Sequence, residues 1–292
     1  RARRRCARRE RLGALCARFP RALKRHCATT PSMELSILSG DELEVIFLGL
    51  CNPFDTRVAM AFGSASRGLC CATQVARQQL RVQSDAAAAL CQRAGIPSCK
   101  KLREATTARW SNTELSIAEL AMLGALGSVV PTLRSLYLFD NVAEPGGMQR
   151  LAEGLGAGSL PCVTRLVLGS MRMGDAGAVA LAAALGRGAL ARLEALSLGD
   201  NGIGDAGLVA LAPALRRLPA LKQLWLVGNP LGDRGLAALV APPLTGTLTQ
   251  LEVLNVDRTQ VTDAGCAILM SALNRDHLVM PALERVLMVG SA

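Results

Sequence analysis

The feature that most constrains this chain is a segment of about thirty residues that recurs six times in its C-terminal half. Each copy opens with the pattern apolar-x-x-apolar-x-apolar, where x is variable. Successive copies begin 30, 30, 28, 30 and 32 residues apart. The alternating end of this pattern is typical of a short β-strand with one buried face. The six segments are 133–138, 163–168, 193–198, 221–226, 251–256 and 283–288.

The second half of the copies recurs as well. A Gly-Asp-x-Gly or Thr-Asp-x-Gly tetrapeptide precedes leucines that are spaced by four residues, as on one face of a helix. A carboxylate at such a place can accept hydrogen bonds from the first free backbone N–H groups of a helix. We therefore predict that these aspartates are helix N-caps: Asp175, Asp205, Asp233 and Asp263.

A polar position follows each predicted strand, eight residues after the first apolar residue of the copy. A side-chain amide there can satisfy backbone groups of the turn. We predict a structural turn role for the asparagines, whereas Met171 lacks the amide. The asparagines at this position are Asn141, Asn201 and Asn229.

One copy is thus a strand, a turn, a capped helix and a loop. A lone unit of this kind cannot bury its apolar edges, but stacked neighbours cover one another. The strands then form one parallel sheet with the helices on its other face. Because a helix is wider (about 10 Å) than the spacing of strands (about 4.8 Å), the stack must curve with its strands inside. The predicted fold class is an α/β solenoid.

This pattern resembles the ribonuclease-inhibitor type of leucine-rich repeat over about 160 residues. The resemblance implies a protein–protein interaction scaffold that binds with the concave face of its sheet. A less regular first repeat is expected to begin at Leu102, with Ala105 and Thr107 in the strand pattern and a helix near 115–126. The chain begins with Arg and ends at the sixth strand, so we expect further sequence beyond both ends.

Variable strand positions of such a sheet face the concave side. The only Tyr of the chain and one of its two Trp residues fall in one of these columns. Aromatic and Arg side chains are common anchors at protein interfaces, although they can also fill space beside small neighbours. The predicted protein-binding residues are Tyr137, Phe139, Arg165, Gln223, Trp225, Asn255, Arg258 and Arg285.

The rest of the chain divides by composition. Residues 1–30 form a basic tail, which is expected to be disordered: its first 27 residues hold eleven Lys or Arg against Glu10, and the remaining chain is neutral. Residues 31–100 form a helical region, and residues 101–292 form the solenoid. In the helical region, Ser39 and Glu42 make a capping-box pattern, and Asn52-Pro53 ends that helix. Two more helices are expected near 55–66 and 74–94.

Part of this helical region resembles an F-box. The residues that carry the resemblance are Leu38, Asp41, Glu42, Leu43, Ile46, Leu50, Pro53, Asp55, Ser66 and Arg67. Two departures weaken it: Ser39 replaces the usual proline, and no tryptophan follows Arg67. The resemblance implies a substrate receptor that docks on the linker subunit of a cullin-type ubiquitin ligase. A third alternative is a GTPase activator, because Ran GTPase-activating proteins share this repeat type.

The sequence favours a protein that is not an enzyme and needs no cofactor or metal. It lacks G-x-S-x-G, P-loop and H-E-x-x-H motifs. Its ten cysteines include no C-x-x-C pair, and neither His26 nor His277 lies near a cysteine pair. Buried reduced thiols indicate a reducing compartment, so the cytoplasm is expected and the nucleus is an alternative.

Two other partners are not favoured. No apolar run approaches the roughly 18–20 residues that cross a bilayer. The basic tail lacks interleaved aromatics beyond Phe19, so nucleic-acid contact by residues 1–27 is not expected.

Overall fold

The structure is a computed structural model that describes residues 39–128, 130–141, 146–156, 158–240, 248–274, 280 and 282–290. The basic tail, Leu38 and both histidines lie outside these residues. The chain divides into two compact units, one that includes residues 39–52 and 56–83, and one that includes residues 53–55 and the chain from residue 84. Each unit is described by itself.

The first unit is helical. It contains α3 (Gly40–Leu50), α4 (Arg57–Gly63), α5 (Arg67–Ala72) and the start of α6 (Gln74–Arg93). The capping box of α3 is confirmed, because Ser39 and Glu42 bond to each other's backbone N–H. The expected helix at 55–66 is wrong in extent, since the side chain of Ser66 caps a separate helix, α5, by accepting the N–H of Leu69. Phe47, Ala59, Ala76 and Leu80 form the core.

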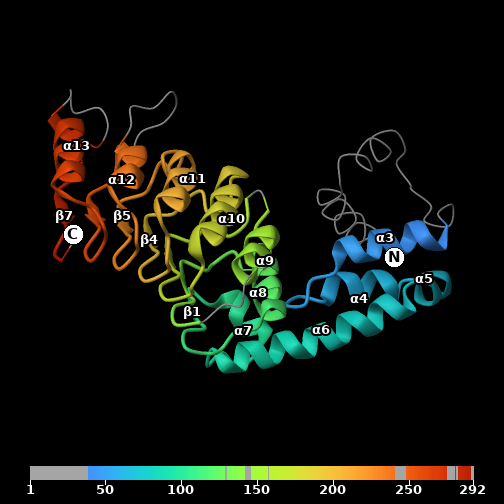
Figure 1. The fold of residues 1–292 in the computed structure, drawn as a ribbon. Coiled ribbons are helices and arrows are strands. Elements are labelled where there is room, and N and C mark those ends of the chain that lie inside the picture. Colours follow the sequence, from blue (N-terminus) through green and yellow to red (C-terminus); the bar gives the residue numbers. More distant parts are fainter. Residues whose placement is uncertain are drawn as a thin grey trace. The chain divides into compact units, whose positions relative to one another are not determined.

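The second unit is a seven-stranded parallel sheet whose strands lie side by side in chain order. Six strands match the six predicted segments, and the curved solenoid of parallel strands and helices is confirmed (Figure 1). The strands are β1 (Thr107–Arg109), β2 (Ser135–Tyr137), β3 (Arg165–Val167), β4 (Ala195–Ser197), β5 (Gln223–Trp225), β6 (Val253–Asn255) and β7 (Arg285–Leu287).

The helices of the second unit cover one face of this sheet (Figure 1). The middle residue of each strand from β1 to β6 is buried under them, as in Leu136 and Leu196. The helices are α7 (Cys99–Glu104), α8 (Ile117–Gly124), α9 (Gly147–Gly154), α10 (Gly174–Gly186), α11 (Asp205–Leu215), α12 (Asp233–Val240) and α13 (Asp263–Asn274), with a 3-10 turn η2 (Ala125–Ser128) after α8.

The first repeat exists, but its expected register is wrong by three residues. Leu102 lies buried in α7, before the strand. Thr107 pairs with Ser135, so Ala105, Ala108 and Trp110 occupy the three apolar positions of the motif. Small alanines conceal the pattern in the sequence. Trp110 is fully buried, and its indole N–H donates to the carbonyl of Leu90 at 2.7 Å. This bond ties the C-terminal part of α6 to the solenoid core.

The buried asparagines connect adjacent repeats. The side-chain N–H groups of Asn229 donate to the carbonyls of Leu198 and Leu226, at 2.9 and 2.8 Å. Its side-chain oxygen accepts the backbone N–H groups of Asn201 and Ile203, at 3.1 and 3.0 Å. Each asparagine therefore satisfies backbone groups in its own turn and in the preceding one.

The other two predicted turn asparagines behave alike. Asn201 donates to the carbonyls of Leu168 and Leu198 and accepts the N–H of Met171. Asn141 donates to the carbonyls of Leu138 and Trp110 and accepts the N–H of Thr113. Met171, which occupies the same position in another repeat, is fully buried in the core.

The prediction that the aspartates cap their own helices is wrong. Helices α10 and α11 begin after Met173 and Gly204, and neither N-cap position makes a side-chain hydrogen bond. Instead, Asp175 accepts the N–H groups of Gly204 and Gly207, at 2.7 and 2.9 Å, and so caps the helix of the next repeat. The position of the aspartates explains the difference, because Asp175 and Asp205 already lie within the first turn of their own helices, and their carboxylates reach the neighbouring repeat.

The same cross-repeat cap recurs twice. Asp205 accepts the N–H groups of Gly232 and Gly235, both at 2.8 Å. Asp233 accepts the N–H and hydroxyl of Thr262, and the hydroxyl bond is the main cause that lowers the pKa of this carboxyl. The second glycine of the tetrapeptide leaves room for the carboxylate: a Cβ on Gly235 would lie 2.8 Å from the Asp205 oxygen.

Asp263 is the exception, since it is exposed and no helix follows α13 among the described residues.

Asp205 and Asp263 occupy corresponding places in their repeats, but only Asp205 caps a following helix, so the two residues provide a matched pair. We expect Asp205→Ala to lower the free energy of unfolding by about 1–2 kcal/mol, because two helix N–H groups lose their acceptor. Asp263→Ala is expected to change it by less than about 0.5 kcal/mol. Urea unfolding followed by circular dichroism measures both, and equal effects would contradict the cross-repeat cap.

Candidate functional site

The face of the sheet opposite the helices carries two columns of side chains. The first and third residues of each strand lie here, and the pairing sets them directly beside their equivalents in the neighbouring strands. One column is Thr107, Ser135, Arg165, Ala195, Gln223, Val253 and Arg285; the other is Arg109, Tyr137, Val167, Ser197, Trp225, Asn255 and Leu287. Side chains in such a column are about 4.8 Å apart.

The two aromatic residues of the second column lie half-buried among smaller neighbours. Trp225 is flanked in its column by Ser197 and Asn255, whose side chains are both shorter. Tyr137 is flanked by Val167 and Arg109. The guanidinium carbon of Arg109 lies 4.5 Å from the centre of the Tyr137 ring, which is within cation–π distance.

Sequence reasoning missed Arg109 as a candidate, because the expected register of the first repeat was wrong. The signal that could have revealed it is the spacing of 28 residues from Ala105 to Leu133, which occurs elsewhere in the array. With that register, the exposed Arg109 falls in the same column as Tyr137.

The other predicted binding residues differ in availability. Arg165, Arg258 and Arg285 are exposed, and Phe139 and Gln223 are half-buried. Asn255 is only 9% exposed, and its side-chain oxygen accepts the N–H of Asp257 at 2.8 Å. It therefore has a structural role in its own turn and offers little surface to a partner.

Charged side chains at the edges of the concave face pair across strands. Lys222 and Glu252, which directly precede β5 and β6, lie 3.5 Å apart. Arg258 reaches Asp200, two repeats away, at 3.6 Å. Gly228 stands between these two positions and has no side chain to block the pair. Exposed pairs of this kind add little stability, but they neutralise one another.

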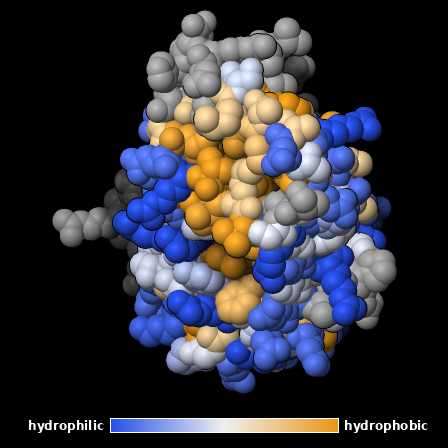
Figure 2. All heavy atoms as spheres, turned by 60° about the vertical axis from the view of Figure 1, so that its left-hand side comes forward, coloured by the Kyte–Doolittle hydropathy of each residue, from blue (hydrophilic) through white to orange (hydrophobic). Residues whose placement is uncertain are grey.

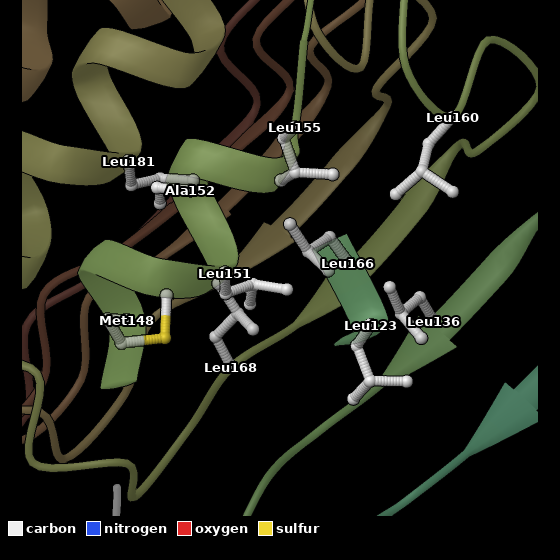
Figure 3. A pocket seen from close by; sticks show the side chains of 10 residues that line it. All are labelled: Leu123, Leu136, Met148, Leu151, Ala152, Leu155, Leu160, Leu166, Leu168 and Leu181. Atoms are coloured by element: carbon white, nitrogen blue, oxygen red, sulfur yellow. The ribbon is translucent and has the colours of Figure 1, made fainter. Parts of the chain in front are cut away.

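Figure 3 shows a cavity inside the solenoid, and this cavity is too small for a ligand. Its free volume is about 10 Å³, about that of a single water. The walls are leucines and other apolar side chains from α8, α9, α10 and the neighbouring strands β2 and β3, and all point inward (Figure 3). A void without polar groups holds no ordered water, so the cavity is a packing defect.

The C-terminal repeat presents apolar surface. Figure 2 turns this end of the view in Figure 1 toward the reader and shows a band of hydrophobic side chains between hydrophilic flanks. In this repeat Leu287 and Val289 are 40% and 76% exposed, and the middle residue of β7, Val286, is only half-buried. The residues equivalent to Val286 in strands β1–β6 are buried, so the last strand is the one whose middle residue is partly open.

The thiols of the described residues are free. Burial, together with the neighbouring thiol of Cys99, raises the pKa of Cys91 to about 12; the two sulfur atoms lie 3.6 Å apart. Burial also raises the pKa of Cys51 to about 11. Within the described part of the chain, no three His, Cys, Asp or Glu side chains group as a metal site would require.

These environments predict an order of thiol reactivity. The thiolate is the reactive form, and a raised pKa leaves little of it at pH near 8. We expect iodoacetamide to alkylate the exposed Cys70 and Cys71 at least about a hundred times faster than Cys91. Peptide mass spectrometry over a time course measures the rates. Comparable rates for Cys91 and Cys71 would contradict the burial of Cys91.

Among the described residues, each helix is too short or too polar to cross a bilayer.

One comparison with known families detects the repeat. The family model described as "Leucine Rich repeat" matches residues 192–212, which include β4 and the start of α11. No curated protein sequence matches the chain. Among solved structures, internalin C2 from Listeria monocytogenes is similar, with 17% identity, a TM-score of 0.34, and coverage of 68% of this chain and 90% of that chain. The matched repeat and the ladder of parallel strands together identify the second unit as a leucine-rich-repeat solenoid.

Proposed function

We propose that this chain is a non-enzymatic scaffold that binds another protein through the concave face of its leucine-rich-repeat sheet. The observation that carries the proposal is the pair of side-chain columns on a rigid, regular sheet. Leucine-rich-repeat domains generally bind other proteins, and curvature makes such a surface concave and extended. Residues 101–292 would form this scaffold and residues 31–100 a separate helical region.

The chemistry of the columns supports the proposal. Interfaces are anchored by a few aromatic and Arg side chains, surrounded by contacts that exclude water. Trp225 lies on the strand next to that of Ser197, and Tyr137 lies two strands away on the other side. The short side chain of Ser197 leaves space above the sheet. A partner side chain over Ser197 could therefore contact an aromatic ring.

A cross-linking experiment tests which face binds. A photo-reactive phenylalanine analogue would replace Ser197 on the concave face, or Val179, which is 51% exposed on helix α10. After irradiation in native extract, we expect protein adducts at position 197 and few at position 179. Adducts of the same proteins at both positions, or only at position 179, would contradict binding by the concave face.

The main predicted anchor is Trp225. Trp225→Ala removes a large apolar surface from an exposed column, so we expect the affinity for a partner captured at position 197 to fall at least ten-fold, roughly 1.4 kcal/mol or more. The melting temperature should change little, because the side chain is only half-buried. Titration calorimetry and thermal unfolding measure the two quantities. An unchanged affinity would mean that the ring only fills space.

A second candidate function, a receptor subunit of a cullin-type ubiquitin ligase, has one observation in its favour. Helix α3 buries Leu43, Ile46 and Phe47, while Val45 and Leu48 are 64% and 51% exposed and lie one helical turn apart. An exposed apolar strip on a helix is a common docking element. The resemblance of this region to an F-box motivates the ligase linker subunit as its partner.

The different exposure of the α3 side chains decides which substitution can test linker binding. Leu43→Asp would unfold the unit because Leu43 is buried, whereas Leu48→Asp changes only the surface. We expect the purified linker subunit to bind the chain and Leu48→Asp to abolish binding, with Val75→Asp, a 67% exposed position on α6, as the control. Absence of linker binding to the unmodified chain would end this candidate. Among the described residues, no feature favours the GTPase-activator alternative.

A further inference from the structure

The concave face is not uniform in charge, and this points to the chemistry of its partner. We propose that its N-terminal part, over strands β1–β3, binds a short acidic segment of the partner protein, with several consecutive Asp or Glu residues. This inference rests on the proposed function and assigns a partner class to part of the same face. Its central residues are Arg109, Tyr137 and Arg165.

The pairing of the strands brings these side chains together. Arg109 lies beside Tyr137, and Arg165 lies beside Ser135, which is two residues before Tyr137 on the same strand. All three side chains are therefore on one face of three adjacent strands. Arg134, which directly precedes β2, adds a third exposed arginine at the edge. The guanidinium groups can converge on carboxylates spaced along an extended segment.

These arginines have no carboxylate partner. Among the described residues, neither Arg109, Arg134 nor Arg165 has an acidic oxygen within ion-pair distance, and the one contact of Arg109 is the ring of Tyr137. In the sequence, Asp140 lies three residues after β2, Glu194 lies directly before β4, and Glu104, three residues before β1, is paired with Lys101. These guanidinium groups are exposed, and a partner that covers them removes their water; because a desolvated Arg without a partner is costly, such a partner should supply carboxylates.

The C-terminal part of the face has the opposite balance. Strands β4–β7 and the residues that flank them carry five acidic side chains against three basic ones, and four of these eight already form pairs. The acidic residues are Glu194, Asp200, Glu252, Asp257 and Glu284; the basic residues are Lys222, Arg258 and Arg285. A partner segment that is acidic over β1–β3 and neutral or basic over β4–β7 matches both parts.

This charge distribution favours a protein segment over a nucleic acid. A long polyanion that followed the face would meet the acidic part and be repelled. Base stacking needs an open aromatic ring, but Arg109 covers one face of Tyr137. Three guanidinium groups suit bidentate contacts with a few carboxylates, which a short run of Asp and Glu provides.

The experiment uses the full chain and a rhodamine-labelled peptide with four consecutive glutamates, with a four-glutamine peptide as the uncharged reference. Fluorescence anisotropy gives the affinities. We expect Arg109→Gln with Arg165→Gln to weaken tetraglutamate binding at least about ten-fold. The matched control is Arg192→Gln with Arg217→Gln, two exposed arginines outside the strands, which should have no effect. All variants keep the basic tail, so its contribution is constant, and thermal unfolding checks that each variant is folded.

Three results would overturn the inference. Equal losses in both double variants would assign binding to net charge, and no loss in either would assign it to the tail. A parallel loss for a ten-nucleotide poly-dT strand would indicate a general polyanion site. A charge exchange adds a positive test: Arg109→Glu with Arg165→Glu should bind a tetralysine peptide in place of tetraglutamate. If these tests fail while cross-linking at Ser197 still captures a partner, the proposed function stands and only the acidic-segment assignment is lost.

Discussion

Asn229→Ala is expected to lower the free energy of unfolding by about 3–5 kcal/mol, because it leaves two buried N–H groups without acceptors. These are the backbone N–H groups of Asn201 and Ile203, which both donate to the side-chain oxygen of Asn229. Asn201 and Ile203 are buried, at 1% and 0% exposure, so water cannot replace the lost acceptor. The carbonyl of Leu226 loses a donor as well.

The control for this prediction is another amide in the same unit. Gln149 is exposed on α9 and bonds only to Glu153, one turn away. Gln149→Ala should change the unfolding free energy by less than about 0.5 kcal/mol. Urea unfolding measured by circular dichroism gives both values. A loss below about 1 kcal/mol for Asn229→Ala would show that the turn satisfies its backbone groups in another way.

The second large effect concerns the contact between helices α8 and α9. A Cβ on Gly154 would lie 2.6 Å from the Cα of Gly124 and 2.9 Å from its carbonyl carbon. Both atoms are backbone, so neither can move without shifting a helix. We expect Gly154→Ala to destabilise the chain by about 3 kcal/mol, at the upper end of the range for overpacking.

A second glycine provides the matched control. Gly186 also ends a helix, α10, but a Cβ there would meet nothing within 4 Å. Gly186→Ala should stabilise the chain by about 0.5–1 kcal/mol, because it restricts the unfolded chain without a clash. Thermal unfolding distinguishes the two variants by sign. Stabilisation by Gly154→Ala would mean that α8 and α9 are not in backbone contact.

The periodic apolar pattern was sufficient to predict the second unit's fold. Segments such as 133–138 and 193–198 repeat at nearly constant spacing, and only a parallel ladder can bury each of them against the next. The turn asparagines could also be predicted, since few side chains other than an amide can both donate and accept in a buried turn. These features depend on the local sequence of one repeat and on neighbouring repeats that share its apolar pattern.

Other features depend on contacts between different repeats, which a single repeat does not encode. Asp205 was expected at the start of its own helix, but its carboxylate reaches Gly232 and Gly235 of the next one. The first repeat lies three residues later than the sequence pattern predicts, because Ala105 and Ala108 are weak apolar signals; the pairing of Thr107 with Ser135 decides the register. That correction added Arg109 to the candidate site.

The sequence by itself determined the strand ladder, the helix layer and the columns that face away from it, because all three follow from periodicity and burial. Only the tertiary structure decided which charges are already paired, such as Lys222 with Glu252, and which arginines are left without a carboxylate. The physical reason is that an ion pair or hydrogen bond depends on the spatial distance between two side chains. Here the partners come from separate repeats, about thirty residues apart in the chain, and only the packing of the repeats sets that distance.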